Sequence, residues 1–144
     1  EVGLRPTIAD IAQEPLDRVK ARLGARAGEV AFVRADLTGQ DWPPASFDLW
    51  HDRAVFHFLT EPAARAAYVT RMKAALKPGG FLVLACFAPD GPEKCSGLPV
   101  RRYDAEGLIA ELGPDFELLE AGREEHPTPF GTTQAFTVAR FRRC

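Results

Sequence analysis

The feature that most constrains this chain is an uninterrupted run of seven apolar residues, 81–87. The turn-forming sequence Lys77-Pro-Gly-Gly80 precedes this run, and Pro89-Asp-Gly-Pro92 follows it. A strand that is apolar on both faces is typical of a parallel sheet that is covered on both sides. We therefore expect residues 81–87 to form a central parallel strand.

Shorter apolar runs and helical patterns alternate along the first half of the chain. Residues 7–11, 30–33 and 47–50 have the composition of buried strands. Residues 15–23 have apolar positions at helical spacing, which Gly24 ends. A second helix is expected to open at Thr60 and Pro62, with an apolar stripe at i, i+4 spacing, and to end at Lys77-Pro-Gly-Gly80.

The last third of the chain changes character. Asp104 is expected to cap a short helix that Gly113-Pro114 ends. Residues 116–122 and 134–142 resemble strands, and the segment between them contains Pro and Gly but no helical pattern, which favours an antiparallel pair. The order predicts an α/β fold: a Rossmann-like, doubly wound, mostly parallel sheet with a C-terminal antiparallel hairpin, in a single domain of residues 1–144.

Composition excludes several classes of function. The net charge is only -2, from 18 basic and 20 acidic residues, so we expect no binding to nucleic acid or to a membrane surface. Cys86, Cys95 and Cys144 have no zinc or disulfide spacing, which is typical of a reducing compartment such as the cytoplasm. No apolar run approaches the ~20 residues that span a bilayer. HExxH, GxSxG, Walker and EF-hand patterns are absent, so no metal site is expected.

Two aspartates follow predicted strands, where ligands of open α/β sheets bind. Asp10 ends the first apolar run, and its carboxylate has the geometry to accept both hydroxyls of a ribose. Asp36 follows the second run, where it is placed to accept a hydrogen bond from the exocyclic amine of a purine while Leu37 packs on the ring. Each is equally well explained as a loop or helix-capping acid.

A third group of polar residues stands where the strand at 47–50 ends. Trp50-His-Asp-Arg53 is costly to bury unless every polar atom is paired, so we interpret it as the wall of an active site. His57 is more typical of a core or surface histidine. Cys86 is expected to be an inert core residue, and Cys95, next to Lys94, is either a reactive thiol or a plain loop cysteine.

Taken together, these segments resemble the class I S-adenosylmethionine-dependent methyltransferases in order and spacing. The chain is especially similar to small bacterial members of the tellurite-resistance and thiopurine-like group. The residues that carry the resemblance are Ile8-Ala-Asp-Ile11, Arg34-Ala-Asp-Leu37, Phe47-Asp-Leu-Trp-His-Asp52, Leu76-Lys-Pro-Gly-Gly80 and the closing pair of strands.

The resemblance implies a role for each group at the sheet edge. S-adenosylmethionine is the implied cofactor, with S-adenosylhomocysteine as its product and a small molecule as the methyl acceptor. By the resemblance, Asp10 and Ile11 bind the ribose, Asp36 and Leu37 bind the adenine, and His51 lies beside the methionine portion.

The acceptor is implied to lie beside Asp52, Arg53 and Phe56, with Cys95 in the same pocket. If the acceptor is an oxygen or nitrogen acid, His51 or Asp52 is the expected base. The sequence gives no signal for the identity of the acceptor or for the oligomeric state.

One part of the family pattern is missing. Members begin with a helix and a first strand that ends in a Gly-rich turn, which holds the methionine moiety. Gly3, Gly24 and Gly28 do not supply that turn, so we expect the chain to be part of a longer protein. The alternatives are that the strands at 7–11 and 47–50 close up directly or that a second chain fills the gap. For function, the alternatives are a cofactor-free binding or assembly module and a nicotinamide-dependent oxidoreductase, which needs GxGxxG before Asp10.

Overall fold

The computed structural model describes residues 3–144, and tertiary contacts divide the chain into two compact units, Glu1–Gln40 and Asp41–Cys144. The single domain expected from the sequence stays a prediction. Among residues 3–144, no helix has both the length and the apolar content needed to cross a bilayer.

The first unit is a β-α-β motif with a parallel ladder. Its elements are β1 (Thr7–Asp10), α1 (Gln13–Leu23), the 3-10 helix η1 (Gly24–Glu29) and β2 (Ala31–Arg34). Strands β1 and β2 pair in parallel, with Asp10 opposite Arg34. Helix α1 ends at Gly24, whose φ of 54° is accessible to glycine at no steric cost. The three predicted elements are therefore confirmed to within two residues.

The second unit contains a mixed sheet of four strands, in the order β3-β4-β8-β7. Its strands are β3 (Phe47–Arg53), β4 (Leu76–Phe87), β7 (Phe116–Pro127) and β8 (Thr133–Arg143). Strand β4 is central, as predicted, but it is parallel only to β3 and antiparallel to β8. The α/β class and the antiparallel C-terminal pair are confirmed.

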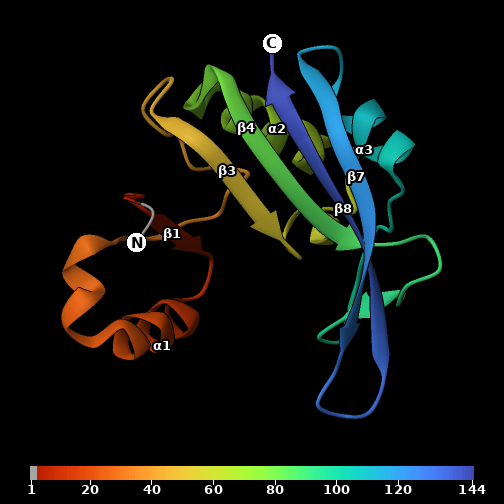
Figure 1. Ribbon diagram of the computed structural model, residues 1–144, viewed down its shortest axis with the longest axis horizontal. Helices are drawn as coiled ribbons and strands as arrows, with labels where there is room; N and C mark the ends of the chain where they lie inside the picture. Colours follow the sequence, from red (N-terminus) through yellow and green to blue (C-terminus); the bar gives the residue numbers. More distant parts are fainter. Residues whose placement is uncertain (1–2) are drawn as a thin grey trace. The chain divides into compact units, whose positions relative to one another are not determined.

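Two helices of the second unit cover one side of its sheet (Figure 1). They are α2 (Pro62–Ala75) and α3 (Ala105–Leu112), and Asp104 caps α3 by accepting a hydrogen bond from the Gly107 N–H. The core lies between helices and sheet, and its fully buried side chains include Tyr68, Met72, Leu82, Leu84, Leu108 and Phe141. On the opposite face, Phe81 and Leu49 are 41% and 46% exposed.

Three short elements were not expected from the sequence. They are the 3-10 helix η2 (Phe56–Phe58) and the two-residue strands β5 (Lys94–Cys95) and β6 (Leu98–Pro99). The pair β5–β6 forms a small hairpin between β4 and α3. These elements are too short to show a hydrophobic period in the sequence.

Strands β7 and β8 extend beyond the rest of the sheet as a long hairpin (Figure 1). The last pair between β4 and β8 joins Phe87 to Phe136, whereas β7 and β8 stay paired to Pro127 and Thr133. We call residues 125–135 the arm. The prediction that the first strand of this hairpin ends at Gly122 is wrong, because cross-strand pairing continues for a further five residues, to Pro127.

Lys77-Pro-Gly-Gly80, which the sequence predicts as a turn, lies inside β4, where the pairing with β3 is irregular, and Gly80 is a sensitive position there. A Cβ at Gly80 would lie 2.8 Å from the Lys77 carbonyl oxygen and 3.1 Å from that of Asp48. We expect Gly80→Ala to lower the free energy of unfolding by about 1–3 kcal/mol, because backbone atoms must move to admit the methyl group. Urea denaturation measures this loss.

The matched control is Gly122→Ala in β7, where an added Cβ meets nothing within 4 Å. That variant is expected to unfold within about 0.5 kcal/mol of the wild type. Equal losses in the two variants would contradict the steric explanation.

Candidate active site

Asp10 is the last residue of β1 and Asp36 lies two residues beyond the end of the neighbouring parallel strand β2 in the first unit. An Asp10 carboxylate oxygen accepts a hydrogen bond from the Ala12 N–H at 2.8 Å, and Asp36 accepts one from the Thr38 N–H at 2.9 Å. The Ala35 N–H donates to the Asp10 carbonyl oxygen, so the loops after β1 and β2 begin side by side. Both carboxylates therefore stabilise their own turns, as the interpretation as loop acids predicts.

The Asp10 side chain nevertheless keeps acceptor capacity. Its Oδ1 is held by Ala12, and within residues 3–144 no partner is found for Oδ2. Asp10 is half-buried and Ile11 beside it is 66% exposed. Asp36 is exposed and also accepts from the Thr38 hydroxyl, and Leu37 next to it is half-buried. A carboxylate oriented by one backbone amide, with an oxygen to spare, suits the hydroxyls of a ribose.

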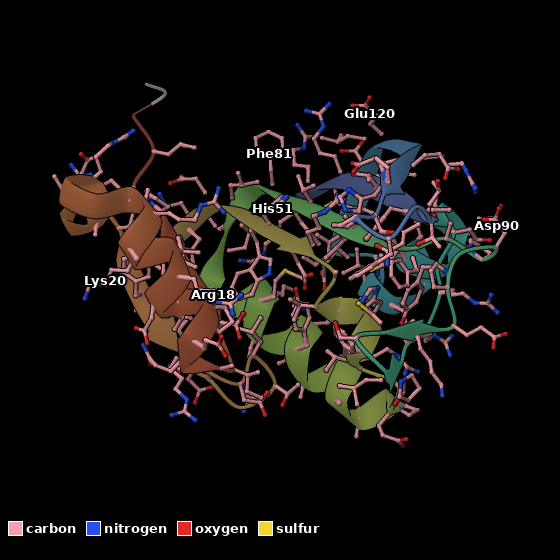
Figure 2. All side chains as sticks on the ribbon, turned by 90° about the horizontal axis from the view of Figure 1, so that it is seen from below. Arg18, Lys20, His51, Phe81, Asp90 and Glu120 are labelled. Atoms are coloured by element: carbon pink, nitrogen blue, oxygen red, sulfur yellow. The ribbon has the colours of Figure 1, made fainter. Side chains whose placement is uncertain are left out.

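Alternate residues of β3 point to opposite sides of the sheet in the second unit. Trp50 and Asp52 point to Tyr68 of α2, whereas His51 and Arg53 are exposed on the other side, which we call the open face. Figure 2 shows His51 with Phe81 and Glu120 on the side away from α2. The prediction that all four residues form a wall is wrong for Trp50 and Asp52, because the strand pleat turns them into the core.

Asp52 is the centre of a buried hydrogen-bond network. Tyr68 Oη donates to Asp52 Oδ2 at 2.5 Å and accepts from Trp50 Nε1 at 2.9 Å. The backbone N–H groups of Val55 and Phe56 also donate to this carboxylate. Burial raises the pKa of Asp52, against the lowering effect of the hydrogen bonds from Tyr68 and the two amides. The network fixes the turn that leads from β3 into η2.

Residues of η2 continue into the core beneath this turn. Phe56 is fully buried, with its ring 5.1 Å from that of Tyr68 and 5.5 Å from that of Tyr103. His57 is also fully buried, and its Nδ1 accepts from the Phe87 N–H at 3.3 Å. Phe56 therefore supports the site from behind, and His57 has the core position that the sequence favours.

Desolvation sets the ionisation of two core groups near η2. Burial lowers the pKa of His57 to about 4, so the ring is neutral near pH 7, and with Nδ1 accepting, the ring proton lies on Nε2. Within residues 3–144, Nε2 has no hydrogen-bond partner. Burial also raises the pKa of the Cys86 thiol, which agrees with an inert core cysteine.

Arg53 and Cys95 both approach the cluster of Phe87 and Phe136 near the carboxyl end of β4. The Arg53 guanidinium lies 4.4 Å from the centre of the Phe136 ring, and its Nη2 donates to Glu124 at 2.8 Å. Cys95 and Val100 pack against the cluster of Phe87 and Phe136. The sequence missed Glu124 and Phe136, because both lie in the long hairpin, whose register no local signal reveals.

Within the described residues 3–144, no three His, Cys, Asp or Glu side chains are grouped so that they could hold a metal ion. Of the polar residues predicted for the site, Asp10 and Asp36 in the first unit and His51 and Arg53 on the open face of the second are not buried.

The sequence of residues 1–80 matches the model of the methyltransferase domain family, over more than half of the 144 residues. The chain belongs to this methyltransferase family. Solved structures agree with that assignment, and 393 of their chains match. No match is found among curated protein sequences.

Three solved structures illustrate what this methyltransferase is similar to. A Methanosarcina mazei SAM-dependent methyltransferase aligns with a TM-score of 0.75 and 18% identity, over 95% of this chain and 81% of its own. The N-methyltransferase NodS of Bradyrhizobium japonicum aligns with 0.75 and 20%, over 95% and 72%. Both show the fold.

The third is 1,6-didemethyltoxoflavin-N1-methyltransferase of Burkholderia thailandensis, solved with 1,6-didemethyltoxoflavin and S-adenosylhomocysteine. It aligns with a TM-score of 0.75 and 26% identity, over 98% of this chain but only 62% of its own. The chain thus spans less than two thirds of that enzyme. Membership of the class I methyltransferases is confirmed, whereas the tellurite-resistance and thiopurine-like group stays a prediction.

Removal of the Tyr68 hydroxyl tests the Asp52 network. Tyr68→Phe leaves Asp52 Oδ2 with only the longer hydrogen bond from the Phe56 N–H and leaves the Trp50 Nε1–H without its partner, so we expect a loss of about 1–3 kcal/mol in the free energy of unfolding. The chain's other tyrosine gives the control, since within residues 3–144 the buried Tyr103 hydroxyl has no hydrogen-bond partner. Tyr103→Phe is expected to be neutral or stabilising, and a loss as large as that of Tyr68→Phe would contradict this account.

Burial of His57 predicts a pH dependence of stability. Its pKa is lowered to about 4 in the fold and is 6.5 as a free group, so between these values the unfolded chain binds a proton that the folded chain does not. Stability is full above pH 6.5 and falls with pH, by up to about 1.4 kcal/mol per unit. Comparison of wild type with His57→Asn by urea denaturation from pH 7 to 4 isolates this effect, and parallel curves would exclude it.

Proposed function

We propose that this methyltransferase transfers the methyl group of S-adenosylmethionine to a small-molecule acceptor and releases S-adenosylhomocysteine. The observation that carries the proposal is Asp10, a strand-end carboxylate with one oxygen held by Ala12 and acceptor capacity left on the other. Family membership supplies the reaction class. The solved relatives that contain S-adenosylhomocysteine support the choice of cofactor.

The residues of the first unit fit an adenosine. Asp10 accepts hydrogen bonds from ribose hydroxyls, with Ile11 as an exposed apolar neighbour. Asp36 and Leu37 bind the adenine, through an accepted hydrogen bond and an apolar contact. Because the Ala12 and Thr38 amides already orient both carboxylates, little side-chain entropy is lost when the nucleoside binds.

The residues of the second unit serve the transfer itself. When bound, the cofactor supplies an electrophilic methyl group on a sulfonium that is a good leaving group. The protein's main task is then to hold the acceptor atom in line with the methyl carbon, near ~3–3.5 Å. We assign His51, exposed on the open face, to the methionine side and to proton removal from an oxygen or nitrogen acid.

Asp52 has a different part in this proposal. Its carboxylate oxygens are occupied by donors from Tyr68, Val55 and Phe56, so the side chain is better suited to positioning than to proton transfer. It holds the turn after β3, where Arg53 and, behind it, Phe56 stand. We assign Arg53 and Cys95 to the acceptor side, where Arg53 stacks on Phe136 and Cys95 packs against the cluster of Phe87 and Phe136.

A small acceptor agrees with the near-balanced charge of -2, which gives no field that would attract nucleic acid or a membrane surface. The toxoflavin relative binds a small heterocycle. A cytoplasmic location remains a prediction from the cysteine pattern.

Calorimetric titration with S-adenosylhomocysteine tests the cofactor assignment. We expect Asp10→Ala to weaken binding by well over tenfold, because the ribose hydroxyls lose their charged acceptor. Asp17→Ala is the control, since Asp17 is an exposed acid of α1 that bonds Gln13. Unchanged affinity in Asp10→Ala would remove Asp10 from the site, and no heat with the wild type would favour the cofactor-free binding module.

A further inference from the structure

Arg53 occupies an unusual position on the open face of the second unit. It is the last residue of β3, at the carboxyl end of a parallel strand pair, where ligands of α/β sheets bind. Its partner Glu124 lies on β7, and β4 and β8 stand between β3 and β7 in the sheet. The side chain therefore extends across Phe136 of β8 to reach this carboxylate.

Two other arginine–glutamate pairs on this face are built differently. Arg140–Glu120 and Arg142–Glu117 join residues directly opposite each other on neighbouring strands. In these pairs the arginine side chain does not have to cross an intervening strand. Only Arg53 among these three arginines has its guanidinium stacked on a ring.

The stacked guanidinium has donors to spare. Nη2 is bonded to Glu124, and within residues 3–144 no partner is found for Nε or Nη1. The side chain is 35% exposed. Because Phe136 supports one face of the planar group, its donors point outward around the edge, in the fork geometry that matches a carboxylate.

The base of the arm is anchored on its other side. Arg123, next to Glu124 in β7, binds both carboxylate oxygens of Asp90, at 2.7 and 2.9 Å, and also contacts Glu125. Asp90 lies in the loop after β4, so this ion pair joins the base of the arm to that loop. The charge of Arg123 is thus matched by two acids, whereas Arg53 faces one, Glu124, with His126 near the edge of the Phe136 ring.

We infer that Arg53 is the recognition group for a carboxylate on the methyl acceptor, with Phe136 as its support and Glu124 as the group that the acceptor carboxylate displaces. The inference rests on the proposed function and deepens it by naming the class of acceptor. Once Glu124 turns to solvent, where it is already 47% exposed, Nη2 is released and forms a bidentate edge for the carboxylate together with Nε or Nη1.

Solution NMR of the protein with benzoate, in the absence of cofactor, tests this inference. Benzoate at millimolar concentration is expected to shift the Arg53 Nε–H resonance and the Phe136 ring protons, and benzamide, which has the same shape without the charge, is not. Arg53→Lys should weaken benzoate binding at least fivefold, because an ammonium lacks the planar fork. Glu124→Gln should strengthen it at least twofold, because it removes the competing carboxylate.

The matched controls are Arg140→Lys and Glu120→Gln, the same changes in the neighbouring pair, which should leave benzoate binding unchanged. Equal shifts with benzamide, equal affinity in Arg53→Lys, or no binding of benzoate would overturn the inference. Because no cofactor is present, each of these outcomes leaves the titration with S-adenosylhomocysteine as a separate measurement of the proposed function.

Discussion

The pleat of β3 is the constraint on which the candidate site of the second unit depends. Successive side chains of a strand point to opposite faces, so Trp50 and Asp52 must share one environment and His51 and Arg53 the other. Tyr68 captures the first two residues in a buried hydrogen-bond network. The other two are thereby held on the open face, at the edge where ligands of such sheets bind.

The buried network also explains why polar residues are tolerated in this core. A buried carboxylate is costly unless its oxygens are bonded, and Asp52 has donors from one hydroxyl and two backbone amides. Each donor lowers the cost of burying this carboxylate, and the network as a whole rigidifies the turn into η2. The rigid network next to Arg53 thereby fixes the backbone from which the Arg53 side chain extends.

Local patterns in the sequence predicted the elements of this fold well. The apolar run at 81–87, the helical stripe that includes Tyr68 and the cap at Asp104 each act over a few residues, and each lies in the expected kind of element, although β4 begins earlier than predicted, at Leu76. The boundaries of the terminal hairpin were wrong at Gly122, because its length depends on pairing between strands and not on a local stop signal.

The contacts of the candidate site were less accessible to sequence reasoning. Asp10 and Asp36 were found because the ends of parallel strands are predictable positions. Arg53 and Glu124, in contrast, are separated by 71 residues, and their contact depends on the order β3-β4-β8-β7. Asp52, expected as a base, is instead a core group, because the pleat of β3 turns it toward α2, where it meets its partner Tyr68.

The charged residues of β7 both protect the edge of the sheet and hold Arg53 through Glu124. It is the edge strand of its sheet, and exposed Glu117, Glu120, Arg123 and Glu124 protect that edge from pairing with another chain. An exposed ion pair such as Arg53–Glu124 is worth only about 0–1 kcal/mol, so its rupture costs little. An acceptor carboxylate can accept two hydrogen bonds from the same guanidinium, whereas Glu124 accepts one, from Nη2. The residue at position 124 of the edge strand therefore sets how strongly Arg53 is held back from a ligand.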